Sequence, residues 1–334
     1  MKKRGIGIGS IFYGTGYGNG FPDVSKAVAQ LKSDGKIAIY VGATEVGQGA
    51  KTALSQIAAE VLGLSVDDIV FINEDTSITP DSGTAAASRQ TYNTGNAIKL
   101  ACEKLKRDIL EVAKDYLGLN SIVGLTLKNG YVYPKTLPEK RVSLGEISES
   151  LESSLKEEAV FTAQTTEMDE ETGQGAPYWP YTFSACGVEV EVDTETGRVE
   201  IIRAVLAQDV GRAINPELIE GQIDGGFAMG AGYALYEDLK IEKGKIKNNS
   251  FTNYLIPTSL DMPDIEKVII EDPESTAPYG AKGIGEPVMI PVAPAILNAI
   301  YDAVGVRMTE IPVTPEKLLK AIKEKEMTYN EGKN

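Results

Sequence analysis

The sequence predicts an α+β protein of two lobes. Helical and strand patterns are mixed along the 334 residues without the regular alternation of strand and helix that builds a parallel sheet. A hairpin pattern followed by a helix pattern occurs in the first half of the chain and again in the second. A chain of this length can form a large core or two domains. We therefore expect a first lobe over residues 1–133, a connecting segment over 134–180 and a second lobe over 181–334.

Turn signals and apolar spacing predict the elements of the first lobe. Asp34-Gly35 and Asn129-Gly130 are dipeptides typical of tight hairpin turns. Ile98, Cys102 and Leu105 begin a series of apolar residues at helical spacing. The expected elements are a hairpin over 25–41, a helix over 49–62, a strand over 66–73, a helix over 95–117 and a hairpin over 125–133.

The second half of the chain opens with a polar stretch. Residues 134–179 include an acidic run at 167–171, which favours a connection with some local structure over core. Asn215 is a helix cap followed by Pro216 at the first helical position. The remaining expected elements are a hairpin over 188–205 and helices over 293–304 and 314–323.

Composition excludes several classes of function. The formal net charge of −15 argues against nucleic acid, whose binding depends on Lys and Arg. The absence of histidine excludes a Ser-His-Asp triad and His-ligated zinc or haem. No apolar run approaches the length of a membrane helix, and the basic N-terminus lacks a signal-peptide core. A cytoplasmic location without nucleic-acid or membrane partners is the default expectation.

The two cysteines cannot supply the four thiolates of an ordinary iron–sulfur cluster. Cys102 lies on the apolar face of a predicted helix, and Cys186 precedes a predicted strand. Both are expected to be buried, and a disulfide between them is disfavoured in a cytosolic protein.

The stretch from Tyr279 to Pro287 places a single carboxylate, Glu286, between Gly285 and a proline. Glycines allow a ligand to approach the backbone, and proline fixes the end of the loop. Taken alone, Glu286 could equally be a solvated turn residue, since the chain holds 48 acidic side chains.

Two further segments could bind a polar or anionic ligand. Gly47, Gln48 and Gly49 precede a predicted helix, whose N-terminus attracts anions; the alternative is an ordinary strand-to-helix turn. Residues 83–91 lack bulky side chains and carry hydroxyls, and Arg89 offers several donors to a phosphate; the alternative is a flexible surface loop.

The glycine-rich start over residues 5–16 lacks the strand–turn–helix context of a dinucleotide-binding motif. Such glycines could let a strand pack close to a ligand, another subunit or the rest of this chain. Phe12, Tyr13 or Tyr17 could then face a substrate.

Four segments in order resemble the xanthine dehydrogenase and aldehyde oxidase family of molybdenum hydroxylases. The segments are 42–63, 75–97, 208–226 and 279–287. The resemblance extends from Arg4 to about Leu319. This part of the chain is similar to the C-terminal half of the family's molybdopterin-binding region. The resemblance implies a two-lobed molybdopterin-binding domain of that family's type.

The resemblance also implies roles for particular residues. Glu286 is expected to be the general base, and Tyr13 to face the substrate. Asp209 is expected to orient a turn, and no protein side chain is expected to bind the metal directly. The cofactor-binding residues are expected to be Gly47, Gln48, Gly49, Ala85, Ala86, Ala87, Ser88, Arg89, Gln90, Thr91, Gln208, Gln222 and Gly285.

Within the family, the chain most resembles the medium molybdopterin subunit of split enzymes of the nicotinate dehydrogenase type. This implies water-dependent hydroxylation of an N-heteroaromatic substrate such as nicotinate. The implied cofactor is molybdopterin cytosine dinucleotide with molybdenum and a sulfido or selenido ligand. The implied partners are a large molybdopterin subunit, an iron–sulfur subunit with [2Fe-2S] and an FAD subunit. A purine substrate such as xanthine and a non-catalytic pterin-holding scaffold are the alternatives.

Overall fold

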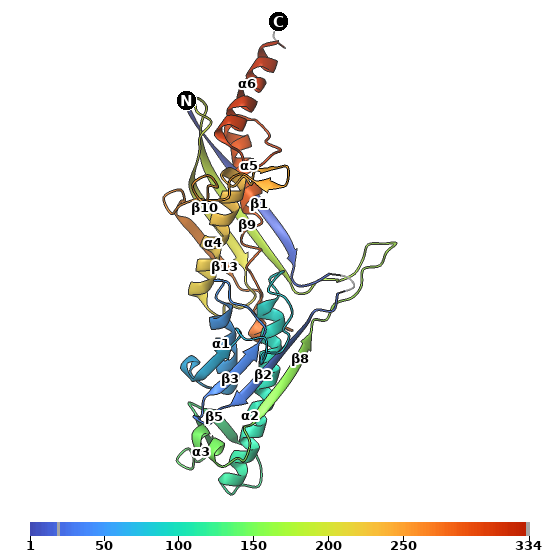
Figure 1. Ribbon diagram of the computed structural model, residues 1–334, viewed down its shortest axis with the longest axis vertical. Helices are drawn as coiled ribbons and strands as arrows, with labels where there is room; N and C mark the ends of the chain where they lie inside the picture. Colours follow the sequence, from blue (N-terminus) through green and yellow to red (C-terminus); the bar gives the residue numbers. More distant parts are fainter. Residues whose placement is uncertain (19–20, 332–334) are drawn as a thin grey trace.

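The computed structural model describes residues 1–18 and 21–331, with side chains through residue 328. Two α+β lobes are stacked end to end, and the C-terminal helix α6 extends from the far end of the second lobe (Figure 1). The predicted α+β class and two-lobed arrangement are confirmed. Residues 332–334, expected at the end of the second lobe, lie outside the described residues.

The first lobe contains a four-stranded sheet in the order β4-β3-β2-β8, with helices α1 and α2 packed against it. Its elements are β2 (Val24–Leu31), β3 (Ile37–Val41), α1 (Ala50–Leu62), a 3-10 turn (Val66–Asp68), β4 (Ile69–Ile72), a π-helical turn (Gln90–Thr94), α2 (Gly95–Tyr116) and β8 (Lys156–Thr162). The predicted hairpin is the antiparallel pair of β2 and β3. The strand predicted from residue 66 starts only at Ile69, because Ser65 caps the 3-10 turn before it.

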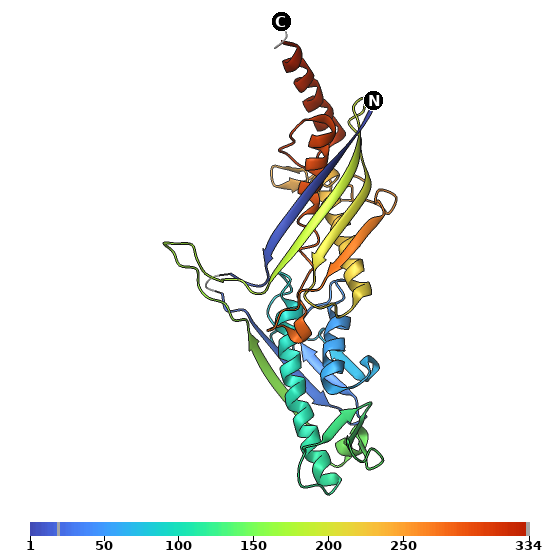
Figure 2. The same ribbon diagram turned by 180° about the vertical axis from the view of Figure 1, so that it is seen from behind.

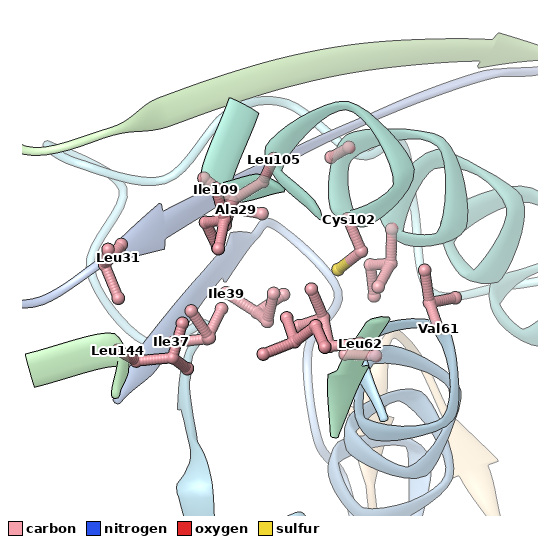
Figure 3. Packing of buried hydrophobic residues seen from close by; sticks show 14 of the residues in the cluster. Ala29, Leu31, Ile37, Ile39, Val61, Leu62, Cys102, Leu105, Ile109 and Leu144 are labelled. Atoms are coloured by element: carbon pink, nitrogen blue, oxygen red, sulfur yellow. The ribbon is translucent and has the colours of Figure 1, made fainter. Parts of the chain in front are cut away.

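Aliphatic side chains from the sheet and both helices form the core of the first lobe (Figure 3). Ile37 and Ile39 of β3 pack with Leu62 of α1 and Leu105 of α2. Cys102 lies in the same core and is fully buried, as predicted; burial raises the pKa of its thiol. The thiol is therefore a small apolar group of the core.

Residues 134–162 also belong to the first lobe, which corrects their assignment to a connection. Strands β5 (Leu125–Lys128), β6 (Tyr131–Pro134) and β7 (Val142–Ser143) form a small sheet, and α3 (Leu144–Glu149) follows. Val142, Leu144 and Ile147 enter the main core, and β8 completes the larger sheet. The few apolar residues of this polar stretch are the buried ones. Within the segment that joins β8 to β9, the chain forms a projecting arm (Figure 1).

The second lobe is a four-stranded sheet in the order β1-β9-β10-β13 with α4 and α5 on one face (Figure 2). Its elements are β1 (Lys2–Gly14), β9 (Tyr181–Asp193), β10 (Val199–Asp209), α4 (Pro216–Leu235), the short pair β11 (Ile241–Glu242) and β12 (Lys245–Ile246), β13 (Ile265–Ile270), a 3-10 turn (Pro278–Gly280), α5 (Val292–Val304) and α6 (Pro315–Glu331). Strands β9 and β10 are the predicted hairpin, and Cys186 of β9 is fully buried as predicted. No helix within the described residues is long and apolar enough to cross a membrane.

Strand β1 corrects the expected boundary between the lobes. Residues 2–14 pair along their whole length with β9, from Lys2 opposite Asp193 to Gly14 opposite Tyr181. The start of the chain therefore belongs to the second lobe and not to a lobe over 1–133. The pairing of β1 with β9 joins residues far apart in the sequence, so no local sequence pattern could predict it.

Glycines on β1 explain why that strand and α5 lie so close together. A Cβ atom at Gly5 would lie 2.3 Å from the Ala299 carbonyl oxygen, and one at Gly7 would lie 2.2 Å from that of Ala295. Alternating glycines thus let the helix backbone rest directly on the strand. The glycine-rich start could have packed against a ligand, another subunit or the rest of this chain. Gly5 and Gly7 pack against the rest of this chain.

Candidate functional site

A cleft of about 230 Å³ lies between the two lobes. The first lobe contributes residues within 46–53 and 85–91, and the second contributes residues within 210–222 and 281–286. The fold thus brings the four sequence motifs, far apart along the chain, to one place.

Glu286 stands in this cleft, half-buried, at the end of the loop that leads into α5. The backbone N–H of Ala87 donates to Glu286 Oε1 at 3.2 Å, and the Ser88 hydroxyl lies 3.4 Å from Oε2. The Tyr13 hydroxyl donates to Oε2. The backbone N–H of Glu286 in turn donates to Ser88 Oγ at 3.0 Å. One carboxylate is therefore held by donors from both lobes.

The backbone around Ser88 is strained where it meets the Glu286 loop. Ala87 and Ser88 have φ values of 53° and 52°, a left-handed conformation uncommon for residues with side chains. A Cβ at Gly283 would lie only 1.8 Å from the Ser88 carbonyl oxygen, so glycine is required there. Strain of this kind tends to occur at functional sites.

Tyr13 lies at the end of β1 and faces the Glu286 carboxylate. Burial and the hydrogen bond to Glu286 both raise the pKa of the Tyr13 hydroxyl. The hydroxyl consequently stays protonated at neutral pH and acts as a donor to Glu286.

The helix terminus after Gly47-Gln48-Gly49 differs from the expected anion site. Glu45 occupies it, because its carboxylate accepts the N–H groups of Gly47, Gly49 and Lys51 at 2.8–3.0 Å. Burial raises the pKa of Glu45, but these backbone hydrogen bonds outweigh it and hold the pKa below its ordinary value. The α1 N-terminus is thus capped within the chain.

Gln48 and Gln90 form a polar pair on the cleft wall. Gln48 Nε2 donates to Gln90 Oε1 at 2.9 Å and to the Thr44 carbonyl at 2.9 Å. Gln48 Oε1 accepts the N–H of Val46 at 2.6 Å. Both side chains line the cleft, so the pair offers an ordered amide surface to a ligand.

Arg89 is not placed to bind a phosphate through its side chain. Its side chain is 0% exposed, and Nε donates to Asp23 at 2.5 Å. The other guanidinium nitrogens donate to the carbonyls of Val24, Ser82 and Thr84 at 2.7–3.2 Å. Arg89 therefore ties the cleft loop to β2, which corrects its expected role.

Arg212 is a basic residue of the cleft lining that was not among the predicted site residues. It is exposed and lines the cleft, and its guanidinium has no hydrogen bond or ion pair to a described residue. Its backbone N–H donates to the Gly280 carbonyl at 3.0 Å, which fixes its position beside the Glu286 loop. The sequence did hold an indication of this site, because Arg212 stands three residues before Asn215, the predicted helix cap.

Gln208 is also placed differently from the prediction. Its side chain is fully buried in the second lobe, where Nε2 donates to Thr182 Oγ1 and to the Asp209 carbonyl. Gln222, Gly285, Thr91, Ala85 and Ala86 do line the cleft. Gly47 and Gln208 lie outside the cleft lining, and Ala87 reaches Glu286 through its N–H group.

Asp209 has structural contacts, in keeping with the turn-orienting role expected from the sequence. It forms a buried ion pair with Lys282 at 2.8 Å and accepts the Gly211 N–H at 2.9 Å. Because Lys282 is four residues before Glu286, this pair anchors the Glu286 loop to the end of β10. No group of three His, Cys, Asp or Glu side chains in the described part of the chain is arranged to hold a metal ion.

Comparison with known proteins shows the family to which the chain belongs. Residues 1–263 match the family model of the molybdopterin cofactor-binding domain. The putative xanthine dehydrogenase molybdenum-binding subunit of Escherichia coli (strain K12) is 34% identical over 322 residues, covering 95% of this chain and 42% of the relative. Aldehyde oxidoreductase of Megalodesulfovibrio gigas is 34% identical over 327 residues, covering 96% of this chain and 32% of the relative.

Among solved structures, quinoline 2-oxidoreductase of Pseudomonas putida 86 superposes with a TM-score of 0.80 at 26% identity, covering 97% of this chain and 42% of that chain. The fold is that of a molybdopterin cofactor-binding domain. The chain belongs to the xanthine dehydrogenase and aldehyde oxidase family. It spans less than half the length of these relatives.

Proposed function

We propose that this chain is the medium molybdopterin subunit of a split molybdenum hydroxylase acting on an N-heteroaromatic substrate such as nicotinate. The observation that carries the proposal is the placement of Glu286. In a domain of this family, a lone carboxylate stands in the inter-lobe cleft and is aligned by Tyr13, Ala87 and Ser88. A scaffold that only held pterin would not need an aligned base.

The cleft residues fit a pterin with an attached nucleotide. Gln48, Gln90 and Gln222 present amides that donate and accept, which suits the edge of a pterin. Arg212 is the side chain available to a phosphate, in place of Arg89. The proposed cofactor is molybdopterin cytosine dinucleotide, with molybdenum carrying a sulfido or selenido ligand and no side chain of this chain bound to it.

The proposed reaction converts a substrate C–H and water to C–OH, two protons and two electrons. When bound, the molybdenum cofactor supplies a Lewis acid and a two-electron acceptor. Glu286 Oε accepts the proton that the water-derived oxygen must lose. Tyr13 and Ser88 hold that carboxylate toward the cleft, and the Lys282–Asp209 pair fixes its loop.

Further protein is needed to complete the proposed site. A cleft of about 230 Å³ falls below the roughly 300–1,000 Å³ of sites that enclose a drug-sized ligand. We infer a large molybdopterin subunit as the opposite wall. A [2Fe-2S] subunit and an FAD subunit are the proposed route for the two electrons, in a cytoplasmic complex.

The relatives bear on the proposed substrate class. Quinoline, in the name of one structural neighbour, is an N-heteroaromatic ring, which supports the preferred class. Xanthine, in the name of a sequence relative, supports a purine as the second candidate. Both rings have an electron-poor carbon next to nitrogen.

The test is purification of the chain with its partners from the native host. Mass spectrometry would identify partner chains, released nucleotide, molybdenum and selenium. Hydroxylation of nicotinate and of xanthine would be followed in isotope-labelled water, and label should appear in the product. A complex with no molybdenum and no hydroxylase activity on either ring would overturn the proposal.

A further inference from the structure

The sheet of the second lobe is covered by helices on one face only. Helices α4 and α5 pack on the inner face, and the opposite face is open in Figure 2. We call this opposite side the outer sheet face. The pairing registers place the following residues on it: Ile6, Ile8, Ser10 and Phe12 of β1, Phe183, Ala185 and Gly187 of β9, Val205 and Ala207 of β10, and Val268 and Ile270 of β13.

Large apolar side chains stand exposed on the outer sheet face. Ile8 is 67% exposed, Phe12 66% and Phe183 52%, and the Phe12 and Phe183 rings stack at 5.2 Å. Between these side chains and Val268 lies a floor of small residues, Ser10, Ala185 and Ala207. Raised apolar side chains around a low floor form a surface that a complementary partner can fill, and contiguous apolar exposure of this kind marks interaction sites.

The outer sheet face is charged at the end far from the cleft and apolar at the end near it. At the far end of the sheet, Lys2 and Arg4 form ion pairs with Glu191, and Arg203 pairs with Glu266. At the near end, Phe12 directly precedes Tyr13, the partner of Glu286. A protein seated on the apolar end would therefore also reach the cleft that the proposed enzyme must close.

The free edge of β1 is less suited to docking than the face. Asp302 of α5 accepts the N–H of Ile6 at 2.9 Å, and Asn298 donates to the Ile8 carbonyl at 2.9 Å. These side chains occupy backbone groups that an added strand would need. Contact through the face leaves them undisturbed.

We propose that the outer sheet face is the docking surface for the large molybdopterin subunit, an inference that rests on the proposed function. Most of the length of the relatives lies outside the part this chain matches, so that partner carries enough protein to cover the face and the cleft together. A second copy of this chain is less suited, because each copy has a net charge of −15. The partner surface should carry aliphatic and aromatic side chains that fill the small-residue floor.

Cysteine labelling tests the proposal, because Cys102 and Cys186 are buried and leave an introduced thiol as the reactive one. Ser10→Cys places a thiol on the floor of the outer sheet face, and Ser121→Cys places a matched control on the first lobe. In the assembled complex, maleimide should label Ser10→Cys at least about 10-fold more slowly than in the chain alone, while Ser121→Cys is unchanged. A benzophenone attached at Ser10→Cys should crosslink to the large molybdopterin subunit.

A charge introduced on the same face gives an independent readout. Phe12→Glu should release the chain from the complex on size-exclusion chromatography, with its circular dichroism unchanged. Val123→Glu, at a side chain 88% exposed on the first lobe, should leave the complex intact.

The outcomes separate this inference from the proposed function. An active molybdenum complex in which Ser10→Cys labels freely, or crosslinks to a second copy, overturns the docking surface and leaves the proposed function standing. A complex without molybdenum and hydroxylase activity overturns both.

Discussion

At the scale of single residues, Glu286 is the group on which turnover should depend. Glu286→Gln keeps the shape and one accepting oxygen but cannot take up a proton. We expect the rate to fall by more than the roughly 10²–10⁴-fold typical of a general base, with normal molybdenum content and assembly. Steady-state kinetics and metal analysis of the purified complex would measure this. Retention of more than about a tenth of the wild-type rate would contradict the assignment.

Tyr13 should support turnover by aligning Glu286. Its hydroxyl stays protonated and donates to the Glu286 carboxylate, which holds that carboxylate toward the cleft. Tyr13→Phe keeps the ring and removes the donor. Because a hydrogen bond to a charged group contributes about 1.5–3 kcal/mol, steady-state kinetics should show kcat and kcat/KM both lowered by about 10-fold or more. A raised KM with kcat unchanged would instead make Tyr13 a residue that contacts substrate.

Two arginines near the cleft should behave in opposite ways. Arg212→Ala should lower retained cytidine nucleotide without changing thermal stability, because its guanidinium has no partner among the described residues. Arg89→Ala breaks a buried ion pair with Asp23, which costs about 3–5 kcal/mol, and should lower the Tm by several degrees. Nucleotide release and thermal unfolding of the purified complexes would compare the two. Equal nucleotide loss in both variants, with the Tm of each unchanged, would show that Arg89 binds the phosphate after all.

At the scale of elements, the contact between β1 and α5 depends on glycine. A Cβ at Gly7 meets helix backbone at 2.2 Å, whereas one at Gly187 of β9 meets nothing within 4 Å. Gly7→Ala should therefore destabilise the protein by about 1–3 kcal/mol or more, as overpacking does. Gly187→Ala should leave stability unchanged or raise it by about 0.4–1 kcal/mol. Thermal unfolding of the two variants measures this, and equal Tm values would show that α5 can move away from the strand.

Elements with local signals were predictable from sequence. The Asp34-Gly35 and Asn129-Gly130 turns and the cap at Asn215 each act within a few residues, and each marks the element it predicted. The polar stretch after residue 134 was misassigned, because its few apolar side chains such as Ile147 are buried by contacts from elsewhere in the chain.

The same distinction applies to the site. The motif segments meet at the cleft as the resemblance implied, but the roles of Glu45 and Arg89 depend on which partners the fold places beside them. A glutamate two residues before a glycine turn carries no mark that it will cap α1. An arginine in a small-residue loop likewise does not reveal that three carbonyls will take its donors.

At the scale of the whole molecule, the fold explains why the two lobes should act as one unit. Strand β1 begins the chain in the second lobe, after which the chain crosses to the first lobe and returns at β9. Glu286 of the second lobe is bound by Ala87 and Ser88 of the first. Neither half of the chain could therefore form the cleft alone.

The whole chain is in turn expected to be insufficient without its partners. Its cleft is small, and the outer sheet face exposes Phe12 and Ile8 to water. Expressed alone, the chain should retain less than about a tenth of the molybdenum per chain found in the complex, and it should show no hydroxylase activity. Co-expression with the large molybdopterin, iron–sulfur and FAD subunits should restore both, through an interface above roughly 2,000 Å² that is typical of obligate complexes. Size, metal content and activity of the two preparations, measured side by side with a Glu286→Gln complex as the inactive control, would decide. A stable monomer that holds the cofactor and turns over substrate unaided would contradict the split-enzyme proposal, because it would show that this chain closes the site without the missing wall.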